Sequence, residues 1–292
     1  MNTLRCGLLG LLLVPASSAF ADSVSGQFVL NGKPIKPSDV AAFRIRDQFH
    51  AREFETYVML TQSPVNGEAI TKSIDPYSTA INDKAAFKAD NIALSVHGDG
   101  VVAMNASVGG VQYIDTSGMI MMQPGSLKAN CTSNTKEHVT CTVKTAAPVK
   151  TMDGTTWSID VSFDSAVLAR TPGTALAKDG AEPGKAFRAF LAVAQGSDLA
   201  KITATMSKRQ AANYTRDYNT PEENLKDFKQ TLGFKLPKQP RVTGGELVND
   251  DYALLDVEGS TDGGSPWLFQ VEMRREDGHW LYDDAGRVGM LK

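Results

Sequence analysis

Hydrophobic residues alternate with polar ones, or form short β-branched runs, from residue 26 to about residue 170. Asn31 and Gly32 follow the first run and are a strong signal for a two-residue hairpin turn. Short strands at this spacing predict a sandwich or an open barrel. Residues 75–90 fit either a short helix or a long loop. The expected strands lie at 26–30, 54–61, 91–96, 101–108, 113–122 and 157–163.

After residue 184 the hydrophobic period becomes that of a helix. Two apolar stripes occupy 187–194 and 199–206. Thr220 and Glu223 form a capping box, which predicts that a third helix begins there. Alternating runs at 252–258, 267–275 and 279–282 then predict three antiparallel strands.

Turn-forming residues are dense between these two patterns, at 171–184. We therefore predict a β-rich domain at 22–172, a linker at 173–183 and an α+β domain at 184–292. The predicted fold class is α+β: a mainly-β sandwich or open-barrel domain, followed by a domain of about three helices and an antiparallel sheet.

Residues 1–21 predict a cleavable secretory signal. Arg5 precedes an apolar run at 8–14, and Ala19-Phe-Ala21 matches a cleavage site. The run is far shorter than the roughly 20 residues that span a bilayer. We expect a mature chain without a transmembrane segment, periplasmic or secreted.

Charge argues against a nucleic-acid partner. Removing Arg5 leaves 29 of the 30 basic residues against 33 acidic ones, a formal charge of −4. The charged clusters are short or of mixed sign, whereas nucleic-acid binding needs a basic face.

Two cysteines, Cys131 and Cys141, remain after cleavage. Lys136 lies midway between them, and the flanking residues have strand character. A hairpin about Lys136 would place the cysteines opposite each other, with Cα atoms roughly 4.5 to 5.5 Å apart. We predict a disulfide between them.

Motifs for catalysis or metal binding are weak. The four histidines, at 50, 97, 138 and 279, are far apart in sequence, so we predict neither a metal site nor a cofactor. The sequence lacks G-x-S-x-G and Ser-x-x-Lys motifs. Catalytic residues are therefore not assigned, although a triad dispersed along the chain stays open.

Carboxylates on the predicted C-terminal strands are the main candidate binding groups. Strand alternation places Asp256 and Glu258 on one face, and Glu272 and Arg274 on the matching face of the next strand. A ligand could meet them if this face lines a cavity. Because the opposite faces are purely apolar, the pattern favours an ordinary polar face instead.

Tyr214 and Tyr218 form a second candidate, an aromatic and basic cluster with Arg216 between two helices. Such groups anchor interfaces. They also pack helix junctions.

The C-terminal order of elements, with Asp277-Gly-His-Trp280 entering the last strand and Val271-Glu-Met-Arg-Arg275 ending the one before, resembles the nuclear transport factor two-like superfamily. This resemblance covers about residue 183 onward. It implies a sheet curled round a helix into a cone with an open mouth. The superfamily contains enzymes, ligand binders and accessory domains, so it leaves the function open.

The sequence favours an exported, non-catalytic binding protein of accessory, inhibitor or immunity type, whose partner is another envelope or extracellular protein. The first alternative is a small-molecule-binding protein or enzyme that uses a pocket in the C-terminal domain. A structural envelope component is the second.

Overall fold

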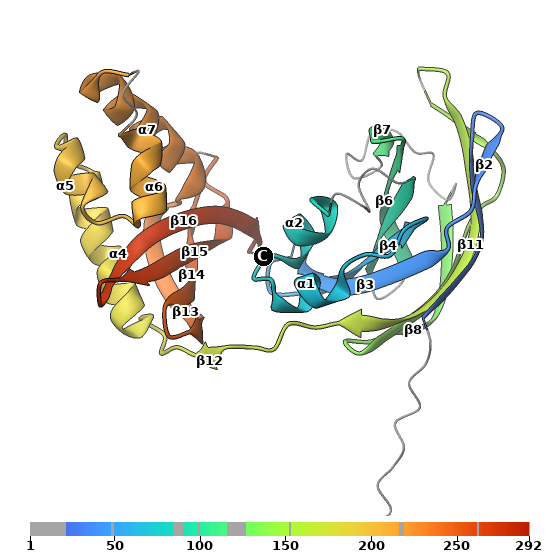
Figure 1. Ribbon diagram of the computed structural model, residues 1–292, viewed down its shortest axis with the longest axis horizontal. Coiled ribbons are helices and arrows are strands. Elements are labelled where there is room, and N and C mark those ends of the chain that lie inside the picture. Colours follow the sequence, from blue (N-terminus) through green and yellow to red (C-terminus); the bar gives the residue numbers. More distant parts are fainter. Residues whose placement is uncertain are drawn as a thin grey trace, which may run out of the picture.

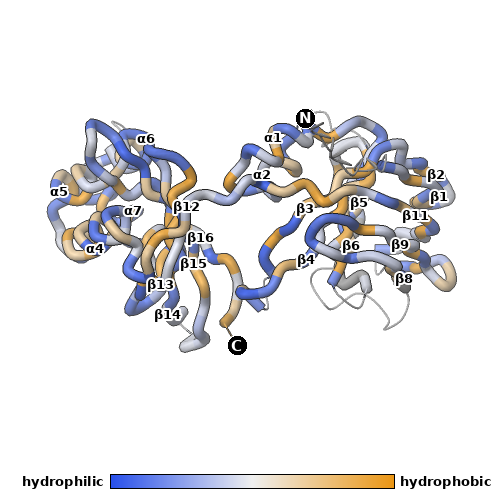
Figure 2. Tube along the Cα trace, turned by 90° about the horizontal axis from the view of Figure 1, so that it is seen from below, coloured by the Kyte–Doolittle hydropathy of each residue, from blue (hydrophilic) through white to orange (hydrophobic). Residues whose placement is uncertain are grey.

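The computed structural model describes residues 22–47, 50–83, 90–97, 100–115, 127–151, 153–215, 219–261 and 263–291. Strands hold 51% of these residues and helices 22%. The strands form two sheets, which lie at opposite ends of the long axis (Figures 1 and 2). None of the described helices is long and apolar enough to cross a membrane.

The first sheet has eleven strands and curls into a half-barrel. Its longest strand, β11, pairs with β1, β9 and β10 in antiparallel fashion and with β3 in parallel. The strands are β1 (Ser23–Leu30), β2 (Lys33–Ile35), β3 (Asp39–Arg46), β4 (Phe54–Thr61), β5 (Asn91–His97), β6 (Gly100–Val108), β7 (Val111–Asp115), β8 (Leu127–Asn134), β9 (His138–Thr145), β10 (Val149–Lys150) and β11 (Thr156–Leu168).

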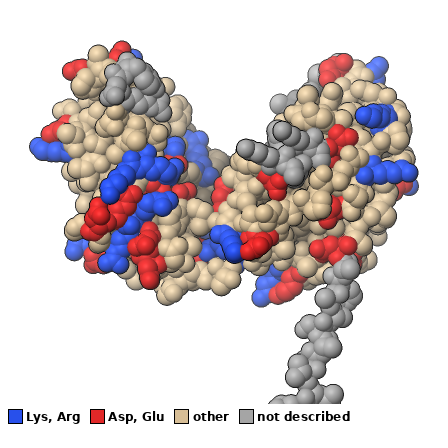
Figure 3. Space-filling view, viewed as in Figure 1, with Lys and Arg blue, Asp and Glu red and all other residues tan. Residues whose placement is uncertain are grey.

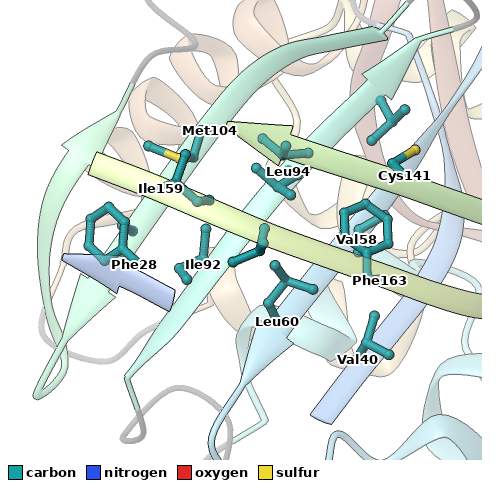
Figure 4. Packing of buried hydrophobic residues seen from close by; sticks show 14 of the residues in the cluster. Phe28, Val40, Val58, Leu60, Ile92, Leu94, Met104, Cys141, Ile159 and Phe163 are labelled. Atoms are coloured by element: carbon teal, nitrogen blue, oxygen red, sulfur yellow. The ribbon is translucent and has the colours of Figure 1, made fainter. Parts of the chain in front are cut away.

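Curling of the first sheet brings the apolar faces of distant strands together. Figure 4 shows side chains such as Phe28, Leu60, Leu94 and Phe163 pointing toward one another in this core. The alternation in β11 is nearly perfect, and its inward residues, among them Trp157, are buried.

Two short helices, α1 (Gly67–Lys72) and α2 (Pro76–Ile81), cover part of the other face of this sheet. Their buried residues Ile70 and Ala80 join a small second core with Phe43, Tyr57 and neighbouring residues.

The second sheet has the order β12-β13-β14-β15-β16 and is packed against helices on one face. Phe187 and Phe190 of α4, Phe228 of α7 and Tyr282 of β16 meet in its core, and the rings of Phe190 and Tyr282 stack with centroids 4.1 Å apart. The strands are β12 (Thr174–Ala175), β13 (Lys238–Asn249), β14 (Tyr252–Ser260), β15 (Pro266–Glu276) and β16 (His279–Met290). The helices are α4 (Ala181–Ala194), α5 (Leu199–Thr203), α6 (Lys208–Ala211), the 3₁₀ helix η1 (Ala212–Tyr214) and α7 (Pro221–Lys235).

Several local predictions are confirmed. Asn31 and Gly32 form the turn between β1 and β2, with φ values of 49° and 79°. The capping box of Thr220 and Glu223 begins α7. Cys131 and Cys141 are paired across β8 and β9 and joined by a disulfide, with Cα atoms 4.0 Å apart, closer than predicted.

The two sheets touch through polar contacts near the chain end. The backbone N–H of Ala51 donates to the carbonyl of Met290 over 2.9 Å. Arg46 faces Asp256 at 3.8 Å, and Glu246 accepts hydrogen bonds from Arg170 and from the N–H of Gly173. In Figure 3, acidic and basic residues lie side by side where the two halves meet.

The predicted fold class, a mainly-β sandwich or barrel domain followed by an α+β domain, is wrong. The described chain is mostly β, its first sheet is a half-barrel, and helices lie on both sheets. Helix α1 was missed because it has six residues and only one buried side chain. Helix α2, equally short, lies within residues 75–90, where the sequence fitted either a short helix or a long loop. Such helices leave no apolar stripe for periodicity to reveal.

The C-terminal sheet is also larger than predicted. Strand β13 was missed because Pro240, Gly244 and Gly245 lie within it and three register shifts break its alternation. Strand β16 continues to Met290, past the predicted end at residue 282, because Asp283 forms a bulge there.

Candidate functional site

The main candidate site is a groove of about 870 Å³ in the C-terminal half. The second half of α4 and the end of α7 form two of its walls. The start of β13, Ser260, Thr261 and Arg287 complete it.

The groove is mainly apolar inside. Leu191 and Ala194 of α4 face it, together with Leu232 and Leu236 at the end of α7. Phe234 stands at this site with 64% of its surface exposed, the largest exposed fraction of any large hydrophobic side chain among the described residues. An exposed aromatic ring beside an apolar hollow is typical of a binding surface.

Cationic side chains accompany the apolar ones. The described lining residues include Arg188, Lys229, Lys238 and Arg287 but neither Asp nor Glu. Arg188 and Lys229 donate to backbone carbonyls, and the guanidinium of Arg287 lies 5.7 Å from the centre of the Trp267 ring. Among the described contacts of Arg188, Lys229 and Arg287, none is with a carboxylate.

The local sequence explains why a groove opens here. Helix α7 ends at Lys235, and Pro237 lacks the N–H that would continue it. The chain then turns into β13 close against β14. A Cβ at Gly259 would lie 2.6 Å from the Cβ of Pro237, so only glycine permits this approach.

A buried carboxylate, Asp283, organises a polar network on β15 and β16. It accepts hydrogen bonds from Ser207, from Arg209 at 2.9 Å and from Arg274 at 3.3 Å. Burial alone would raise the pKa of Asp283, but the hydrogen bonds from Arg209 and Ser207 outweigh burial and hold this pKa below its usual value.

The pKa of Glu272 is shifted in the opposite direction, upward. Glu272 accepts a hydrogen bond from the Tyr252 hydroxyl and lies 4.0 Å from Arg209. Burial raises its pKa, and the charges of Asp284 and Asp283 add to that shift. Burial and Glu272 also raise the pKa of Tyr252.

The sequence-predicted site residues fall into separate places. Asp256 and Glu258 lie at the contact with the first sheet, where Glu258 is paired with Arg52 and Arg241. Burial raises the pKa of Asp256, and Arg46 opposes that rise. Glu272 and Arg274 belong to the Asp283 network and do not line the groove.

The apolar faces of β14 and β15 pack on the helices, as expected from alternation. The carboxylate face therefore lies outside that core. It is not simply a solvent-facing polar surface, because Leu254 and Leu268 on it are buried.

Of the two predicted tyrosines, Tyr214 is buried and packs edge-on against Phe228, with ring centroids 5.3 Å apart. Tyr214 therefore packs the junction between η1 and α7. Tyr218 lies outside the described residues.

A group in the first sheet has the composition of a metal site. Single ligand atoms of Asp47, Glu55 and His97 all lie within 4.8 Å of one another. Sequence reasoning missed it because the three residues lie far apart along the chain, just after β3, in β4 and at the end of β5. It also missed the groove cations, because a lone surface arginine or lysine has no sequence signature.

No protein-family model matches this chain, and no curated protein is similar to it by sequence.

Proposed function

We propose that this chain is a non-catalytic binding protein that acts outside the cytoplasm and holds an amphipathic anion in the C-terminal groove. The proposed ligand has an acyl chain and a single carboxylate head group. The observation that carries this proposal is the combination, in one groove, of an apolar interior with cationic side chains and no described carboxylate.

Size supports a small molecule. Small-molecule sites usually enclose roughly 300 to 1,000 Å³ and are lined mainly by apolar groups with a few polar ones. The groove, at about 870 Å³, falls within this range. An acyl chain would contact Leu191, Leu232 and Phe234.

Charge supports an anionic head. Arg188, Lys229 and Arg287 are spread over α4, α7 and β16, so an anion in the groove would be met from several sides. The whole chain has a net charge of −3, so these cations are a local feature and not a general surface property. A charge-assisted hydrogen bond is roughly twice as strong as a neutral one.

Location outside the cytoplasm rests on the predicted signal at 1–21 and on the disulfide of Cys131 and Cys141. Disulfides persist in oxidising compartments. The resemblance of the C-terminal part to the cone-shaped superfamily is consistent with a ligand held at an open mouth, and remains part of this proposal.

The test is a titration of purified residues 22–292 with dodecanoate, followed by calorimetry. Dodecyltrimethylammonium has the same chain with a cationic head and serves as the matched control. We expect saturable one-to-one binding of dodecanoate and at least about tenfold weaker binding of the cationic analogue. Equal binding of the two would refute the charge argument.

Substitutions of groove residues test whether dodecanoate binds in the groove. Phe234→Asp and Arg287→Glu should each weaken dodecanoate binding at least about tenfold, corresponding to about 1.4 kcal/mol. Lys201→Glu, on an exposed lysine of α5 outside the groove, should leave it unchanged. Failure of dodecanoate to bind, with stoichiometric capture of an envelope protein by the same chain, would replace this proposal with the protein-partner alternative.

A further inference from the structure

A second, independent site lies at the end of the first sheet nearest the second one. Asp47 follows β3, Glu55 is in β4 and His97 ends β5. These strands are neighbours in the sheet, in the order β3-β4-β5. The alternation of side chains places the three residues on the same face.

The histidine ring stands between the two carboxylates. Its Nε2 lies 2.6 Å from Oε2 of Glu55, and its Nδ1 lies 3.2 Å from Oδ2 of Asp47. A second imidazole is close, because Nδ1 of His50 lies 3.6 Å from the same Asp47 oxygen. Two carboxylates and two imidazoles thus lie within a few ångströms of one another.

These groups are shielded from water. The exposed fractions of the side chains are 3% for Asp47, 12% for Glu55 and 24% for His97. Two carboxylates and an imidazole are therefore held close together in a place that water reaches poorly.

The two nearby arginines donate their described hydrogen bonds to other groups, although the charge of Arg44 also acts on Glu55. Arg44 donates to the Thr56 hydroxyl and to the carbonyl of Phe54. Arg46 donates to the carbonyl of Ala51 and faces Asp256. Neither guanidinium is hydrogen-bonded to Asp47 or Glu55 among the described contacts.

We propose that Asp47, Glu55 and His97 bind one Zn²⁺ ion, with water or His50 in the fourth position. Zinc takes imidazole and carboxylate ligands at about 2.0 to 2.2 Å, usually in a tetrahedron. Ligands of a tetrahedral ion with bonds of about 2.1 Å stand about 3.4 Å apart. The three ligand atoms, now within 4.8 Å of one another, would therefore shift by up to about 1.4 Å relative to one another. Binding displaces any proton that the imidazole carries, and the ion neutralises both carboxylates.

Such an ion would stiffen the turn that joins β3 to β4. His50 donates its backbone N–H to Asp47, and the same turn contacts the second sheet through Ala51 and Arg52. The expected role of the ion is therefore structural: it would hold the segment around Ala51 and Arg52 in position against the second sheet.

The test uses untagged residues 22–292, stripped with a chelator and titrated with ZnCl₂ by calorimetry. Co²⁺ absorption provides a second readout, because its visible spectrum reports coordination. We expect one equivalent of zinc, at least tenfold weaker binding in Glu55→Gln and in His97→Ala, and altered Co²⁺ spectra in both. His138→Ala is the matched control, since the described ion pair of His138 is with Asp164, on another part of the sheet.

Circular dichroism and urea unfolding would establish that the variants are folded; Glu55→Gln keeps the side-chain shape. Absence of zinc binding to the folded wild-type chain would overturn the proposal. So would equal binding by wild type, Glu55→Gln and His97→Ala.

Discussion

Arg52, in the turn after β3, and Glu258, in β14, form an ion pair with 3.0 Å between Nη2 and Oε1, although 206 residues separate them in sequence. Arg241 pairs with the other oxygen of Glu258. A carboxylate of the second sheet is therefore held between two guanidiniums, one of which belongs to the first sheet.

Glu258→Lys should destabilise the fold, because it places a third cation between Arg52 and Arg241 in a side chain that is only 15% exposed. We expect a loss of about 1 to 3 kcal/mol in the free energy of unfolding, measured by urea denaturation at pH 7. As a control, Asp160→Lys removes an exposed pair with Lys144 and should cost less than about 1 kcal/mol. Equal losses of unfolding free energy in the two variants would show that the contact of Glu258 with Arg52 and Arg241 contributes no more than an exposed ion pair.

Asp283→Asn should destabilise the C-terminal half by about 1 to 3 kcal/mol at pH 7, since a buried charged acceptor is lost. The pKa of Asp283 is lowered in the fold, so its stabilisation is complete above its unfolded pKa of about 3.9 and is lost as pH falls through the lower folded pKa. The difference between wild type and Asp283→Asn should therefore shrink below about pH 4. Unfolding measured from pH 7 to pH 3 tests this, and a difference that grows in acid would contradict it.

Glu272→Gln should show the opposite trend. The pKa of Glu272 is raised by burial, so its ionised form is disfavoured in the fold at neutral pH. Wild type gains stability as pH falls through that raised folded pKa, a gain that is complete below the unfolded pKa of about 4.3. The stability of Glu272→Gln relative to wild type should thus be highest at pH 7 and decline toward pH 4. The same unfolding series measures it, with Asp283→Asn as the contrasting variant.

Replacing Cys131 and Cys141 by serine should lower the free energy of unfolding by about 2 to 3 kcal/mol, because the unfolded chain regains the freedom of a short loop. Denaturation of the wild type in a reducing agent should give a similar loss. The serine variant should not respond to the reducing agent, and a response there would show that the reagent acts elsewhere.

Local features were predictable from sequence because neighbouring residues determine them. The turn at Asn31, the capping box at Thr220 and the pairing of Cys131 with Cys141 all depend on chemistry within about ten residues. The fold class was not predictable in this way. Curling of the first sheet requires β3 to pair with β11, which begins more than a hundred residues later.

The candidate sites show the same limit. Asp256 and Glu258 were identified as polar residues of one strand face, but what they meet, Arg46 and Arg52, comes from the other sheet. His97 had no apparent partner in sequence, because Asp47 and Glu55 approach it only when three strands align.

The most direct test of the central proposal is photo-crosslinking with a diazirine-bearing fatty acid, followed by mass spectrometry of the labelled peptides. We predict labels on α4 and α7 around Leu191 and Phe234, competed by excess dodecanoate and reduced in Arg287→Glu. Labels spread over the surface, or labels that dodecanoate does not compete, would contradict binding of an amphipathic anion in this groove.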